Sequence, residues 1–319
     1  MPAQRSRSTR NHKKRRNHTK GLWAAISTLL LILLAIVFYL NRDNILAVIQ
    51  PSTRESQTVA TKSAATSTSQ GATRETSEAS SLSSEDITWE KQAEPVKIPI
   101  LMYHAVHVMA PEEAANANLI VDPTTFESHL KAFQEAGYYT LTPEETYKIL
   151  TENVLPKGKK VVWLTFDDSL WDFYSIAYPL LKQYNMKATN NVITGVTDTQ
   201  PDHLTLEQIK EMRDNGMSFQ SHTVNHPDLE YSSLEAQNTE LKDSKSYLDQ
   251  ELNQDTIAIA YPAGRYSDQT IKTVEEAQYK LGVTTNEGLA SAANGLLTLN
   301  RVRILPVTTA EGLLQTIGQ

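Results

Sequence analysis

Apolar positions in residues 95–319 follow two different periods, which alternate along the chain. Short runs rich in apolar and β-branched residues, such as KVVWLTF at 160–166, are typical of buried strands. Stretches such as 126–136 repeat apolar residues every three to four positions and stop at a glycine, which is typical of helices. The predicted strands are 96–103, 160–166, 187–193, 217–220, 256–260, 281–285 and 302–305. The predicted helices are 126–136, 173–184, 206–215, 234–252, 267–280 and 309–317.

Strands that alternate with helices predict a parallel sheet, and about seven such units in one domain favour an α/β fold of the (β/α) barrel type. Several chemically capable groups come directly after predicted strands. They are His104, Asp167, Asp168, His222, His226 and the turn at 262–264. In (β/α) barrels the carboxyl ends of the strands form the face on which active sites are built. We therefore expect these groups to share one site.

The first 40 residues have the pattern of a membrane anchor. Residues 1–21 form a basic tail, with eight Lys or Arg and no acid in the first 20 positions. Residues 22–40 are 19 positions without a charge, enough for a helix that spans a bilayer core of ~30 Å. The tail predicts a cytoplasmic amino terminus and an extracellular remainder, as on a bacterial cell surface. A cleaved signal peptide is the alternative, but its apolar region is usually only ~7–15 residues long. We favour the uncleaved anchor.

Residues 41–94 are predicted to be a disordered linker, because from position 51 onward they are dominated by small and polar residues. One sizeable α/β domain then occupies residues 95–319. The chain has a net charge of −7, and the tail carries +8, so the remainder carries −15. An acidic domain of this kind excludes a nucleic-acid partner. The absence of cysteine excludes a disulfide scaffold.

Two short motifs, TFDD at 165–168 and SHTVNH at 221–226, carry the chemistry that the sequence suggests most strongly. Together they offer two carboxylates and two imidazoles. One Asp and two His can hold a divalent metal with positions left open, as in catalytic sites. The second carboxylate is then free to act as a base. The alternative is an Asp pair that caps a helix and two surface histidines. The position of both motifs at strand ends favours the metal site.

These two motifs, with YPAG at 261–264, resemble the first three motifs of the polysaccharide deacetylases of carbohydrate esterase family 4, the NodB-homology domain. The resemblance covers roughly residues 97–306. The run ILMYH at 100–104 is similar to one branch, the biofilm poly-N-acetylglucosamine deacetylases, whose barrel is circularly permuted. In that branch an amino-terminal histidine replaces the acid that other members take from a carboxyl-terminal Leu-x-His. This chain has no histidine near its end.

The resemblance implies a role for each matching position. Asp168, His222 and His226 would bind one divalent metal, Zn²⁺ first and Co²⁺, Ni²⁺ or Mn²⁺ as alternatives. Asp167 would be the base and His104 the acid, although a structural histidine is the alternative for His104. The backbone N–H of Ala263 would stabilise the oxyanion.

The sequence departs from the family pattern at two places. Ser169 stands where the family usually has glycine, so this turn is either a strained left-handed one or an ordinary α-region one. The Arg that opens the third motif in many members is absent, and Arg301 or Arg303 is a candidate to orient Asp167 instead. We favour a role for both as surface charges at a strand end. Trp171 and Tyr174 either line a sugar-binding wall or pack at the start of a helix.

We therefore expect a metal-dependent extracellular N-deacetylase that removes acetate from N-acetylglucosamine units. Its polysaccharide partner would be poly-N-acetylglucosamine or the glycan strand of peptidoglycan. Two alternatives remain. One is hydrolysis of O-acetyl esters on a plant or wall polysaccharide, which uses the same machinery. The other is a noncatalytic glycan-binding wall protein on the same fold.

Overall fold

A computed structural model describes residues 87–318 of the chain. The predicted anchor at 22–40 and nearly all of the predicted linker lie outside this range. Within 87–318, no helix has the length and apolar character needed to cross a bilayer.

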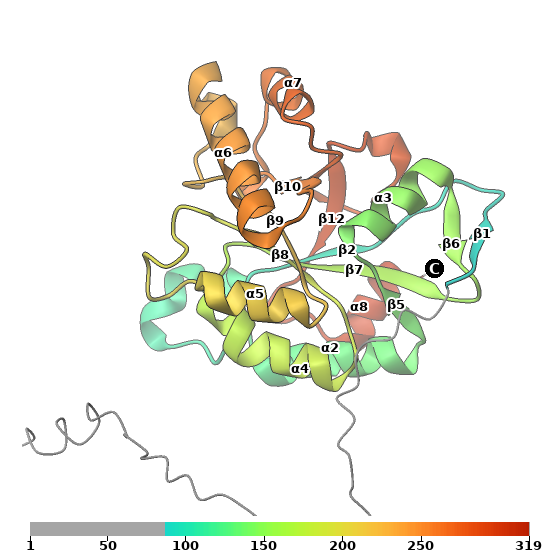
Figure 1. The fold of residues 1–319 in the computed structure, drawn as a ribbon. Helices are drawn as coiled ribbons and strands as arrows, with labels where there is room; N and C mark the ends of the chain where they lie inside the picture. The colour runs from blue at the N-terminus through green and yellow to red at the C-terminus, as the bar shows by residue number, and fades with distance from the viewer. Residues whose placement is uncertain (1–86, 319) are drawn as a thin grey trace, which may run out of the picture. The chain divides into compact units, whose positions relative to one another are not determined.

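Seven parallel strands close into a barrel surrounded by helices (Figure 1). The strand β2 pairs with β12 on one side and with β7 on the other, and this double pairing closes the ring. Around the barrel the strands are β2 (Ile100–Tyr103), β7 (Lys160–Phe166), β8 (Thr189–Val192), β9 (Ser218–Ser221), β10 (Ala258–Ala260), β11 (Leu281–Glu287) and β12 (Leu299–Arg303). The predicted barrel of about seven strands is confirmed.

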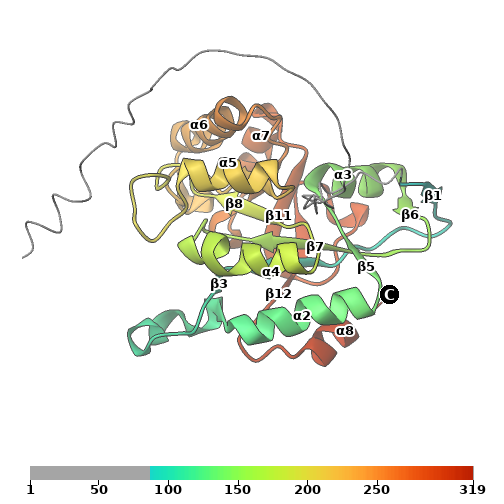
Figure 2. The same cartoon turned by 60° about the horizontal axis from the view of Figure 1, so that its bottom comes forward.

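The helices follow the strands in the expected alternation, and α8 lies beside α2 in both views of the ribbon (Figures 1 and 2). Their bounds are α2 Pro123–Glu135, α3 Pro143–Glu152, α4 Tyr178–Gln183, α5 Leu206–Asp214, α6 Leu234–Leu252, α7 Asp268–Glu276 and α8 Ala310–Ile317. The predicted helix at 173–184 begins with a π-helical turn, Phe173–Ala177. Four short 3₁₀ segments are Pro111–Leu119, Leu229–Tyr231, Pro262–Gly264 and Ala292–Asn294.

The sequence analysis missed α3 and the strand before it, β5 (Tyr138–Thr140). The signal for α3 was present: Thr142 accepts from the Glu145 amide, and the Glu145 side chain accepts from the Thr142 amide. This reciprocal capping box marks a helix start. β5 pairs with the first half of β7 on the edge away from β2, since the Leu141 amide donates to the Val162 carbonyl and the Trp163 amide donates the opposite way, to the Pro99 carbonyl. Two small additions are β1 (Trp89–Lys91) with β6 (Val154–Pro156) and β3 (Ala105–Val106) with β4 (Ile120–Val121).

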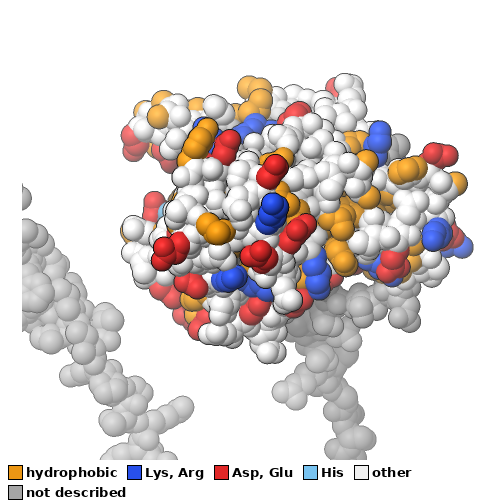
Figure 3. All heavy atoms as spheres, turned by 90° about the horizontal axis from the view of Figure 1, so that it is seen from above, with side chains coloured by type: hydrophobic (Ala, Val, Ile, Leu, Met, Phe, Trp, Pro, Cys, Tyr) orange, Lys and Arg blue, Asp and Glu red, His pale blue; other side chains and the backbone are white. Residues whose placement is uncertain are grey.

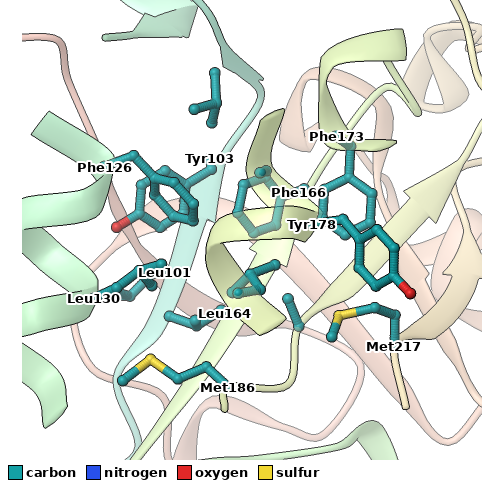
Figure 4. Close-up of a cluster of buried hydrophobic side chains, with 14 of the residues drawn as sticks. Leu101, Tyr103, Phe126, Leu130, Leu164, Phe166, Phe173, Tyr178, Met186 and Met217 are labelled. Carbon is teal, nitrogen blue, oxygen red and sulfur yellow. The ribbon is translucent and has the colours of Figure 1, made fainter. Parts of the chain in front are cut away.

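Side chains of β7 alternate between the barrel interior and the layer under the helices, as a strand period of two requires. Trp163 lies inside, where its Nε1–H donates to Thr189 Oγ1 at 2.8 Å. Leu164 and Phe166 lie outside. There, Phe166 joins an aromatic cluster with its ring centroid 5.0 Å from that of Tyr103 (Figure 4). The cluster holds β2 and β7 against the helices and so fixes the strand ends that carry the site.

On the face seen in Figure 3, acidic and basic side chains lie side by side. Among the described residues, ion pairs also join separate segments of the chain. Lys245 and Lys280, for example, both contact the carboxylate of Asp255, at 2.8 and 3.1 Å. Surface pairs of this kind contribute little to stability individually.

Candidate active site

Strand alternation explains how the candidate residues come together at one end of the barrel. Trp163 and Thr165 point inward from β7. Because side chains alternate along a strand, Asp167, two residues after Thr165, points inward as well. In the same way, the His104 side chain points inward just after β2, and the His222 side chain points inward just after β9. The amide of Asp167 donates to the Tyr103 carbonyl at 3.0 Å, so the ends of β2 and β7 lie level. The predicted grouping at the carboxyl ends of the strands is therefore observed.

Asp168, His222 and His226 converge on one point. Each offers a ligand atom, and these atoms lie within 4.8 Å of one another. Asp168 Oδ1 is 3.3 Å from His222 Nε2 and 3.7 Å from His226 Nε2. His222 Nδ1 lies 2.7 Å from the Ala260 carbonyl, so this nitrogen carries the hydrogen and Nε2 presents a lone pair. One carboxylate oxygen and two imidazole nitrogens fit Zn²⁺ and related divalent ions.

The ligand loops are held in backbone conformations that residues other than glycine rarely adopt. The φ angles are 75° at Asp168, 53° at Ser169, 67° at Thr223 and 55° at His226. Left-handed geometry costs about 1–3 kcal/mol per residue, so surrounding contacts must enforce it. The amide of His226 donates to Thr223 Oγ1 at 3.0 Å, and the Glu240 carboxylate accepts the two amides between them. Of the two possibilities for Ser169, the left-handed turn is the one observed.

Asp167 forms a buried ion pair with Arg301. The Arg301 Nη1–H and Nη2–H donate to Asp167 Oδ1 and Oδ2 at 2.9 and 2.7 Å, and Asn191 Nδ2–H donates to Oδ1 at 2.7 Å. Burial alone would raise the pKa of Asp167, but the Arg301 charge and hydrogen bonds hold it well below its usual range.

The prediction of Arg301 as a surface charge is wrong, because its side chain is 0% exposed. Its Nε–H donates to the Thr284 carbonyl at 2.7 Å, and this bond fixes the plane of the guanidinium. Arg301 thus orients Asp167, the role that the sequence analysis raised but did not favour. Arg303 is half-buried on the same strand and does not take part in this pair.

His104 directly follows β2 and is half-buried. Burial lowers the pKa of its imidazole by more than the nearby charges of Asp167 and Asp168 raise it. His104 thus lies near enough to Asp167 and Asp168 for their charges to act on its imidazole. Its role as the acid stays a prediction.

Ala263 lies in a turn with a φ of 52° and a ψ of 15°. The hydrogen bonds of the turn run from the Gly264 and Arg265 amides to the Tyr261 and Pro262 carbonyls, and so they do not use the Ala263 amide. Gly264 also has a positive φ, and a Cβ at this position would collide with the Thr285 side chain. The turn is thus fixed with one N–H available, although its role toward an oxyanion stays a prediction.

The sequence analysis missed two groups beside the site. Asn191 gave no signal, because an amide in a strand is not distinctive. His107 belongs to no recognisable motif, but its Nδ1 lies 2.6 Å from Asp172 Oδ2 and its Nε2 lies 3.0 Å from Glu113 Oε1. His129, which also belongs to no motif, is buried between the Tyr103 hydroxyl and the Thr308 carbonyl.

We expect His222→Ala and His226→Ala each to weaken binding of one divalent ion by at least about 100-fold. Loss of an outer-shell partner alone typically costs 10–100-fold, and these residues would be ligands themselves. Calorimetric titration of Zn²⁺ into the metal-free full-length protein measures the effect. His203→Ala is the control, because His203 pairs only with its neighbour Asp202. Full stoichiometry at micromolar metal in both site variants would overturn the ligand assignment.

Comparisons with known proteins agree with this geometry. Residues 155–282 match the family model described as polysaccharide deacetylase. YxkH of Bacillus subtilis, assigned to the polysaccharide deacetylases, is 42% identical over 218 residues, which are 68% of this chain and 75% of YxkH. The poly-beta-1,6-N-acetyl-D-glucosamine N-deacetylase of Staphylococcus aureus is 29% identical over 183 residues, 53% of this chain and 62% of that protein.

A solved structure, the Streptococcus pyogenes deacetylase PplD in complex with acetate, superimposes with a TM-score of 0.68. It is 63% identical and covers 71% of this chain and 100% of that one.

Proposed function

Because this chain belongs to the polysaccharide deacetylase family, whose members hydrolyse amide or ester bonds of polysaccharides, we propose that it removes acetyl groups from N-acetylglucosamine units of a cell-surface glycan. One observation carries the proposal. A buried carboxylate, Asp167, paired with Arg301, adjoins the convergent donors of Asp168, His222 and His226. A noncatalytic binding protein has no need of this arrangement.

Asp167 has one oxygen free to take a proton. Its Oδ1 already accepts two hydrogen bonds, from Arg301 and Asn191, whereas Oδ2 accepts only one. The open lone pair on Oδ2 is the acceptor for a proton of the attacking water. With its pKa so far below the usual range, Asp167 is a weak base. Asp168, His222 and His226 would hold a divalent ion, which would lower the pKa of water and polarise the acetyl carbonyl.

Two further groups complete the hydrolysis of the amide. The Ala263 N–H donates to the carbonyl oxygen as negative charge develops on it, a contact commonly worth about 3 kcal/mol. His104 lies on the strand next to that of Asp167 and gives a proton to the sugar amine as it leaves. The products are acetate and a glucosamine unit.

Support for the sugar comes from the staphylococcal relative, which acts on poly-N-acetylglucosamine according to its name. Acetate release by the full-length protein from a panel of N- and O-acetylated oligosaccharides tests the proposal. We expect release from N-acetylglucosamine oligomers in the presence of Zn²⁺ or Co²⁺, and none from the Asp167→Asn variant. Release only from O-acetylated sugars would identify an esterase, and no release from any substrate would favour a binding protein.

We also propose that residues 22–40 anchor the enzyme and that residues 41–319 lie outside the cell. The support is the uncharged run of 19 residues that follows eight basic ones. Protease added to intact, wall-stripped cells should remove the catalytic domain and spare the basic tail. Protection of residues 95–319 in such cells would contradict the topology.

A further inference from the structure

Trp171 is an exposed aromatic residue in the loop that carries the base and a metal ligand. It comes three residues after Asp168, and 43% of its surface is exposed. The structure separates it from Tyr174, the other aromatic residue of this segment. Tyr174 donates to the Glu211 carboxylate at 2.7 Å and stacks on Tyr178, so it packs along the helix. Trp171 instead stays partly exposed to solvent.

The indole of Trp171 stacks on the ring of His107. The ring centroids are 5.9 Å apart and the planes are inclined by only 24°. His107 is itself fixed on both nitrogens, by the buried carboxylate of Asp172 and by Glu113. The indole therefore lies on a rigid support, and a rigid aromatic surface loses little conformational entropy when a ligand stacks on it.

The support joins the two loops that carry the catalytic groups. Asp172 Oδ2 also accepts the Val106 amide at 2.8 Å, two residues after His104. On the other side, the Trp171 amide donates to the Asp202 carbonyl at 3.1 Å. These contacts tie Trp171, which follows Asp167 in the chain, to the segment that follows His104.

Polar groups flank the indole. The Glu113 carboxylate lies at the edge of the His107 ring, 3.0 Å from Nε2, and its side chain is 35% exposed. The Asp202 side chain, beside the Trp171 backbone, is 67% exposed. An apolar ring face bordered by carboxylate acceptors matches a pyranose, which presents C–H groups on its face and hydroxyls on its rim.

We propose that Trp171, on its His107 support, binds the pyranose ring next to the sugar that is deacetylated. This binding site rests on the proposed function and deepens it, because it makes the enzyme prefer oligomers over single sugars. Trp171 makes this contact equally before and during the reaction, so it affects KM and not kcat.

Steady-state kinetics of the full-length protein on N-acetylglucosamine and its dimer and longer oligomers test the site. We expect Trp171→Ala to raise KM on oligomers about tenfold, a typical strength for an aromatic contact, and to leave kcat unchanged. Activity on an acetyl ester with a phenolic leaving group should be unaffected, because that substrate has no second ring. Trp171→Phe should keep most of the oligomer affinity. Val307→Ala, which alters an exposed apolar side chain without a ring, is the control.

An unchanged KM on oligomers in Trp171→Ala would overturn the proposal, and so would an equal loss on the small ester, which would make Trp171 structural. If the wild-type protein releases no acetate at all, the proposed function is wrong. An oligomer-binding experiment then still tests whether Trp171 binds a sugar. Titration with oligomers should then shift the tryptophan fluorescence of the wild-type protein. Persistence of the full shift in Trp171→Phe would also overturn the site.

Discussion

Replacement of Arg301 by methionine should lower the stability of the protein by about 3–5 kcal/mol and remove most of its activity. The substitution leaves the Asp167 carboxylate buried without its ion pair, and breaking a buried pair at one partner has this typical cost. Without the hydrogen bonds from Arg301, the proton-accepting oxygen of Asp167 no longer has a fixed orientation. Since acid–base groups commonly contribute 10²–10⁴-fold, we expect a decrease in kcat/KM within that range. Urea unfolding and acetate release measure the two effects.

A double variant separates the loss of stability from the loss of activity. In the double variant Asp167→Leu with Arg301→Met, apolar side chains replace both charges, and such replacements are often neutral or stabilising. Stability should return to near the wild-type value while activity stays absent. Arg303→Met, on the same strand, is the control and should change neither. Wild-type stability and activity in Arg301→Met would show that the pair is not needed.

The pH dependence of stability gives an independent check on the pair. In the wild-type protein the pKa of Asp167 is held below its ordinary value by Arg301. The contribution of the pair is therefore complete above about pH 3.9, the pKa of an unfolded Asp, and is lost as the pH falls further. In Arg301→Met, burial raises the pKa of this carboxyl instead. That variant should lose stability relative to the wild-type protein as the pH rises above about 4. A constant difference between the two proteins from pH 3 to 7 would contradict this.

Substitution of His104 by asparagine should reduce deacetylation of an N-acetyl sugar by 10²–10⁴-fold, the usual contribution of a general acid. A sugar amine is a poor leaving group and needs a proton to depart. A phenolate leaves without one, so the same variant should keep far more activity on an activated acetyl ester. Metal binding should be unchanged, because His104 is not one of the three converging ligands.

The pH profile distinguishes the acid from a structural histidine. Burial lowers the pKa of His104 below its ordinary value of about 6.5, so the protonated form decreases already on the acid side of neutrality. The resulting decline in kcat/KM toward high pH should be present with the sugar and absent with the ester. His203→Asn serves as the control, since His203 pairs with the exposed Asp202. Equal losses on both substrates in His104→Asn would mean that His104 is structural.

Much of the fold followed from local patterns in the sequence. The helix at 234–252 is observed with the predicted bounds, and Ser267 and Thr309 cap helices where the sequence placed a start. These features depend on neighbouring residues only. The candidate metal donors could be predicted for a related reason, because the residues at the ends of parallel strands share one face of a barrel whatever the details of packing.

Tertiary structure alone decided what surrounds those donors. Arg301 lies 134 positions from Asp167, and a charged residue near a strand end looks like a surface residue until its strand is placed inside the barrel. His107 meets Asp172 across 65 positions, and no local pattern links the two. Ser169 adopts a glycine-like φ only because the packed loops around it enforce one. The sequence by itself therefore determined most of the elements and the candidate metal donors, since these rest on patterns among neighbouring residues. The orientation and the charge of Asp167 depend on burial and on contacts with residues far away in the sequence, and only the closed barrel creates these.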